Sequence, residues 1–103
     1  MDKLALKFEE ELRDKMYIAK KECRYNATYF IQMMNENGGV NTAKILIAKA
    51  IQTGQLSDGF SRLFMEGRLD LSMEDSVCKE EYRPLFSEEE IAYCRKVIGK
   101  SEK

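Results

Sequence analysis

The chain has 103 residues, of which 44% are hydrophobic and 34% charged, with a net charge of −1 and no histidine. This length predicts one domain, and this apolar content is too high for a disordered chain. Histidine is the usual general base near neutral pH and the commonest metal ligand. Its absence leads us to expect a protein without catalysis, metal ion or cofactor.

Cysteine usage and hydropathy favour the cytoplasm. Cys23, Cys78 and Cys94 form no C-x-x-C pair, and an odd number is not a disulfide framework, so we expect small buried hydrophobic side chains. The N-terminal residues are amphipathic and lack the apolar core of a signal peptide. No run approaches the ~20 apolar residues of a membrane span, so we expect no membrane contact.

A long helix is predicted at residues 2–23, about 30 Å in length. One narrow apolar stripe recurs every three or four residues along it. The stripe consists of Leu4, Phe8, Leu12, Met16, Ala19 and Cys23. Such a stripe serves either as a core face or as a seam between two copies. We favour packing within the chain, and a monomer or a homodimer through this helix are the two oligomeric states expected.

Three shorter helices should follow, each begun by a side-chain cap and ended by glycine. We expect them at 27–35 after Asn26, at 42–53 after Asn41, and from Ser57 or Asp58 to Gly67. The C-terminal glycines of the first two are Gly38 or Gly39, and Gly54.

The stretch GRLDLSMEDSV, residues 67–77, is interpreted as a corner. Leu69 and Leu71 alternate with polar residues, which predicts two extended residues that push both leucines into the core. Ser72 caps a short helix over 73–79, with acidic residues in its first turn. An ion pair of Arg68 with Asp70 would lock this corner.

Residues 81–86, EYRPLF, are predicted to be an extended connector because Pro84 disfavours helix at the preceding residue. Ser87 and Glu90 form a capping box that begins a last helix, which Gly99 should end. The whole is an all-α protein: a single compact domain of five or six helices, with a long N-terminal helix at 1–23 and a helical core at 24–99.

Acidic residues gather in the C-terminal half. Residues 66–90 hold nine acidic and three basic side chains. They are either a solvated surface with acids at helix N-termini, or a face that meets a basic surface such as the nucleic-acid channel of another protein. The candidate partner-binding residues are Asp70, Glu74, Glu80, Glu81, Glu88 and Glu89.

A basic alternative lies in the first half of the chain. The second and third helices with the GGVN turn could form a helix-turn-helix, although a slightly negative chain disfavours nucleic-acid binding. The candidate residues are Lys20, Lys21, Arg24, Lys44 and Lys49.

Four segments carry a resemblance to small uncharacterised bacterial helical proteins and to modules of larger ones. They are KKECRYNATYFIQMM, GGVNTAKILI, GFSRLFMEGRLDLSMEDSV and RPLFSEEEIAYCRKVI. The group shares a G-F-x-x-L-x-x-x-G-R-L-D-L-S-x-E core and a P-L-F-x-x-E-E-I element. The resemblance covers about three quarters of the chain and brings no established activity.

The chain is also similar in size and style to accessory proteins of phages and mobile elements, some of which are counter-defence factors. We therefore expect a non-enzymatic protein that binds a protein or ribonucleoprotein partner. Its sharpest form is a stoichiometric inhibitor or regulator of a nucleic-acid-handling complex, such as a bacterial CRISPR defence effector. Direct binding of DNA or RNA is the alternative.

Overall fold

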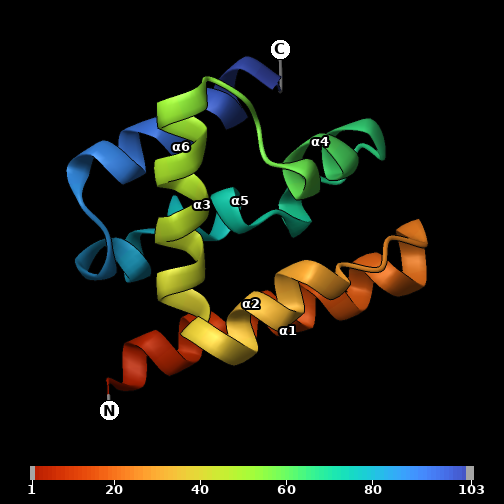
Figure 1. Cartoon of the computed structure of the whole chain (residues 1–103), viewed down its shortest axis with the longest axis horizontal. Coiled ribbons are helices and arrows are strands. Elements are labelled where there is room, and N and C mark those ends of the chain that lie inside the picture. The colour runs from red at the N-terminus through yellow and green to blue at the C-terminus, as the bar shows by residue number, and fades with distance from the viewer. Residues whose placement is uncertain (1, 102–103) are drawn as a thin grey trace.

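A computed structural model describes residues 2–101, and it is all-α over that range, as the sequence predicts (Figure 1). Six α-helices and two short 3₁₀ helices follow one another without a strand in the described part of the chain. The elements are α1 (Lys3–Cys23), α2 (Thr28–Asn37), α3 (Gly39–Thr53), α4 (Asp58–Met65), η1 (Leu69–Leu71), α5 (Met73–Val77), η2 (Glu80–Leu85) and α6 (Glu88–Ser101).

Helix α1 runs the length of the molecule. Its 21 residues, at 1.5 Å each, span about 32 Å, close to the longest molecular extent of 34 Å. Asp2 caps the helix by accepting a hydrogen bond from the Leu4 amide at 2.9 Å. Figure 1 shows α2 returning alongside α1, with α3 rising from that pair toward α6.

The apolar stripe of α1 is buried within the chain, apart from the half-buried Leu4. Its N-terminal half, including Phe8 and Leu12, packs with α3, α5, η2 and α6. Its C-terminal half, including Met16 and Ala19, packs with Leu63 of α4 and Leu71 of η1. The stripe is therefore a core face, as favoured, and it is not an exposed seam for a second copy.

The junction of α2 and α3 differs from the prediction at both caps. Ala27, not Asn26, precedes the first turn of α2, and it has no side-chain cap because its buried methyl group packs in the core. Helix α3 begins at Gly39, three residues before the predicted start. The amide of Gly39 donates to Glu9 Oε1 of α1 at 2.8 Å, so a distant carboxylate replaces the local cap of Asn41.

Gly39 is required by this contact. A Cβ there would lie 2.8 Å from the Cα of Glu9, closer than real Cβ atoms approach backbone. The glycine thus lets the start of α3 rest directly on α1, and the close approach places the Glu9 carboxylate at the first turn.

Two segments predicted as extended are 3₁₀ helices. In η1 the amide of Ser72 donates to the Leu69 carbonyl at 3.0 Å, and only Leu71 of the two leucines is fully buried. In η2 the fixed φ of Pro84 suits a 3₁₀ turn, and this places Tyr82 in the core against Phe8. Tertiary packing of these apolar side chains selects the tighter turns.

The last helix begins as predicted and ends later. Ser87 Oγ accepts from the Glu90 amide while Glu90 Oε1 accepts from the Ser87 amide, which completes the capping box. Helix α6 passes through Gly99 to Ser101, so this glycine does not end it. Within residues 2–101, no helix combines the length and apolar character that crossing a membrane requires.

Candidate functional site

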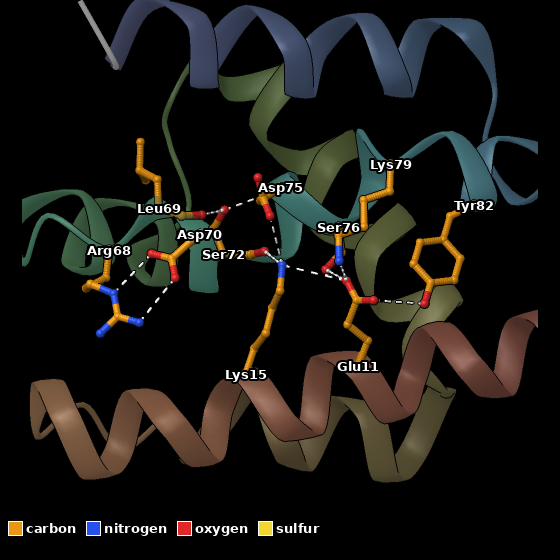
Figure 2. Close-up of polar contacts among 10 residues, drawn as sticks. All are labelled: Glu11, Lys15, Arg68, Leu69, Asp70, Ser72, Asp75, Ser76, Lys79 and Tyr82. Atoms are coloured by element: carbon orange, nitrogen blue, oxygen red, sulfur yellow. Dashed lines mark hydrogen bonds and ion pairs between the residues drawn. The ribbon is translucent and has the colours of Figure 1, made fainter.

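The GRLDLSMEDSV corner is held by ion pairs and by a buried lysine (Figure 2). Arg68 donates twice to Asp70, at 3.1 Å each, and also contacts Glu22 of α1. These contacts lower the pKa of the Asp70 carboxyl, chiefly through the hydrogen bonds from Arg68. The expected Arg68–Asp70 ion pair is thus present. Both carboxylate oxygens of Asp70 accept a hydrogen bond from Arg68 within the chain.

Lys15 anchors the same corner to α1. Its side chain is only 10% exposed, and Nζ donates to the Ser72 carbonyl at 3.2 Å and to Asp75 Oδ2 at 3.1 Å. Figure 2 shows Lys15 and Glu11 rising from α1 toward η1 and α5. A lysine buried in this way donates hydrogen bonds to the backbone carbonyl that follows η1 and to a carboxylate in the first turn of α5.

Glu11 makes a second anchor one helical turn before Lys15. Its carboxylate accepts from Ser76 Oγ at 2.6 Å and from Tyr82 Oη at 2.9 Å, and pairs with Lys79 at 3.0 Å. Burial opposes ionisation, but these donors outweigh it and leave the pKa of Glu11 lowered. The polar residues around the motif therefore have structural roles.

One predicted partner-binding residue is misplaced. Glu74 is not on the acidic face: it is only 4% exposed, because α5 turns it inward rather than toward solvent. The first turn of a short helix is compatible with either direction, and the packing of Met73 and Val77 against the core fixes the inward one.

Four of the five remaining candidate acids belong to η2 and to the first turn of α6. Glu80, Glu81, Glu88 and Glu89 are all exposed, and we call this set the acidic corner. Lys7 pairs with Glu81 at 2.7 Å. Arg83 lies 3.8 Å from Glu80 and 3.6 Å from Glu88, so these contacts are loose. Among the described residues, the ion-pair partners of this set are Lys7 and Arg83, so the paired groups keep a net negative charge. Asp70, in η1, is not part of this set.

The five predicted basic residues are not one surface. Lys20, Lys21 and Arg24 are exposed around the C-terminal end of α1, whereas Lys44 and Lys49 belong to α3, which Figure 1 places away from that end. Lys44 is held by Glu90 at 2.8 Å and lies over the Phe86 ring. A helix-turn-helix surface that uses all five is therefore absent from the arrangement.

A cavity of about 410 Å³ opens between α2, α3, α4 and α5. Its walls are mainly apolar, with Phe30, Leu46, Phe60 and Leu63 among them. Tyr29, which lines it from α2, is 73% exposed. We call this hollow the Glu74 cavity, because the buried carboxyl of Glu74 belongs to its lining.

Ser57 is the one described residue whose side chain donates a hydrogen bond to Glu74, at a long 3.3 Å. Burial raises the pKa of Glu74 to about 7. The hydrogen bonds from its own backbone amide and from Ser57, and the charge of Lys15, only partly oppose this. The cavity lining thus holds a carboxyl that burial makes harder to ionise.

The sequence analysis did not identify this cavity. Glu74 follows a serine cap, and that position alone explains an acidic residue by the helix dipole. Its contact with Ser57, 17 residues earlier at the N-cap of α4, distinguishes it. Within residues 2–101, no three or more cysteine and carboxylate side chains gather as a metal site would require.

Comparisons with known proteins do not assign a function. No model of a protein family matches the chain, and no curated protein or solved structure is significantly similar to it.

Proposed function

We propose that this protein is non-catalytic and binds a macromolecular partner through the acidic corner. The observation that carries the proposal is that Glu80, Glu81, Glu88 and Glu89 are all exposed on the consecutive elements η2 and α6. Within the described residues, Lys7 and Arg83 are the cations that form ion pairs with this set. The sharpest form is a stoichiometric inhibitor or regulator of a nucleic-acid-handling complex, such as a CRISPR effector of bacteria. That form is suggested by the similarity in size and style to accessory proteins of phages and mobile elements.

The physical argument is charge complementarity. Proteins that bind nucleic acid present basic grooves to phosphates, and exposed carboxylates can occupy such a groove in their place. Glu88 is 92% exposed and Glu80 is 78% exposed, so a partner's cations can reach both. Complementary charges also accelerate association, which suits an inhibitor that competes with a charged polymer.

The experiment replaces the four carboxylates of the acidic corner by glutamine, which preserves side-chain size. A matched control neutralises four exposed acids elsewhere, so that both variants gain the same charge. The control positions are Glu10, Asp14, Glu36 and Glu66. We expect the corner variant to lose most partner binding and the remaining binding to be less sensitive to salt, while the control keeps binding. If both variants lose partner binding equally, the loss is explained by the change in net charge alone, and the proposal is contradicted.

Direct nucleic-acid binding is the second candidate. Lys20, Lys21 and Arg24 are exposed at one end of α1, and Lys21 lies over the exposed ring of Tyr17. The matching test is a gel shift at low salt, comparing wild type with a variant in which these three cations are alanine. A salt-dependent shift that the variant abolishes would favour this function over the acidic corner. If wild type gives no shift, this candidate is excluded.

A further inference from the structure

We propose that the Glu74 cavity binds a small molecule that carries one protonated amine on an apolar body. The inference does not depend on the acidic corner, which lies on η2 and α6, outside the lining of this cavity. It rests on the size of the cavity, on the composition of its walls and on the charges in its lining.

The size and walls fit an apolar body. About 410 Å³ is within the range of small-molecule sites, which are mostly apolar with a few polar groups that fix orientation. Phe30 and Phe60 provide aromatic walls, and Leu46 and Leu63 provide aliphatic ones. Ring faces also attract cations, so they favour a positively charged ligand over a negatively charged one.

The buried carboxyl selects the charge. Glu74 is 4% exposed, and its carboxyl receives a hydrogen bond from its own backbone amide and a long one from Ser57. Part of its acceptor capacity is therefore unused. The charge of Lys15 acts on Glu74, but its Nζ hydrogen-bonds the Ser72 carbonyl and Asp75. An ammonium group in the cavity would supply both a charge and donors to Glu74 directly. The lining holds two carboxyls, Glu74 and Asp58, against one cation, Lys49. Lys49 is exposed.

The test uses three probes that share an indole ring and differ in the end group. Tryptamine carries an ammonium, tryptophol a hydroxyl, and indole-3-propionic acid a carboxylate. Titrations of the full chain at pH 8 and 150 mM salt are followed by calorimetry and by amide chemical shifts. A primary amine stays protonated at this pH. We expect tryptamine to bind about tenfold more tightly than tryptophol and the acid to bind most weakly, since a charge-assisted hydrogen bond is about twice as strong as a neutral one.

Two matched variants identify the carboxyl. Glu74→Gln should lower the affinity for tryptamine about tenfold and leave that for tryptophol within twofold. Asp58→Asn removes the exposed carboxyl of the same lining and should change neither affinity by more than twofold. Leu46→Trp, which fills part of the cavity, should weaken both probes by the same factor.

Three outcomes would overturn the proposal. The first is equal affinity of wild type for tryptamine and tryptophol, and the second is no binding of any probe at millimolar concentration. The third is that Asp58→Asn loses the preference for tryptamine over tryptophol while Glu74→Gln keeps it. If Glu74→Gln does not fold, the ranking of the three probes on wild type and their response to Leu46→Trp still decide.

Discussion

Replacing Glu74 by glutamine should stabilise the protein, and more so as the pH rises. Glutamine has the same shape, and its amide oxygen can still accept the hydrogen bond from Ser57. It removes the one property that burial opposes, which is the ability to ionise. The effect is therefore expected to depend on pH rather than to be constant.

The magnitude follows from the pKa of Glu74. Burial raises it from 4.5 to about 7, and this corresponds to about 3 kcal/mol once the carboxyl is ionised in both states. The raised group is neutral below pH 4.5 in the folded and the unfolded chain, so it costs nothing there. The cost grows as the pH rises through the window between the two values and is complete above pH 7. From pH 5 to pH 8 the advantage of Glu74→Gln should grow by about 2–3 kcal/mol.

Other titratable and charged side chains face Glu74, and the comparison of wild type with Glu74→Gln must separate their effects from that of Glu74. They are Lys15 of α1, Tyr25, Lys49 of α3, Asp58 of α4, Cys78, and Tyr93 and Cys94 of α6. Burial raises the pKa of both tyrosines and of both thiols, so these four stay neutral up to pH 8. Wild type and variant share all of these groups, so the difference between the two proteins reports Glu74.

Urea denaturation of both proteins at pH 5, 6, 7 and 8 measures the effect, since the unfolding free energy is extrapolated at each pH. An advantage that grows with pH supports a buried carboxyl that is neutral in the folded chain. The quantity compared is the unfolding free energy of Glu74→Gln minus that of wild type. If this difference stays constant with pH, or if it falls between pH 5 and pH 8, the reasoning is refuted.

The remaining predictions concern the contacts that build the corner and the helix starts. Glu11→Ala leaves two buried hydroxyl groups without an acceptor and should cost about 3 kcal/mol in urea unfolding; a loss near zero would contradict the anchoring role. Gly39→Ala forces a Cβ to within 2.8 Å of a backbone atom of α1 and should cost about 2 kcal/mol. Gly99→Ala is its control, because open space surrounds that helical position, and it should gain about 0.5 kcal/mol. Arg68→Ala, which breaks the exposed pair with Asp70, should leave the urea midpoint nearly unchanged.

Local signals in the sequence were sufficient for the helices and for several caps. The stripe of α1 repeats at helical spacing, Ser72 caps α5 by accepting from the Asp75 amide, and the capping box of Ser87 and Glu90 is complete. The class and order of the elements follow from such patterns, because they depend on residues within a few positions of one another.

The structure differs from the prediction where a contact with a residue distant in the sequence determines the local conformation or burial. Glu9 caps α3 from another helix, which moves the start of α3 to Gly39. Lys15 lies outside the apolar stripe of its helix, yet two oxygen acceptors from the corner allow it to be buried. Glu74 points inward although its position fits an exposed first turn. None of these three contacts leaves a local pattern, so a single sequence does not predict them.

The most direct test of the central claim is an affinity capture with three tagged proteins: wild type, the glutamine variant of the acidic corner, and the matched control variant. Each is incubated with bacterial lysate, with and without nuclease, and the retained proteins are identified by mass spectrometry. The account predicts a protein or ribonucleoprotein partner that wild type and control retain after nuclease treatment and that the corner variant loses. Retention of the same partner by all three proteins, or recovery only of nucleic acid and of proteins released by nuclease, would contradict it.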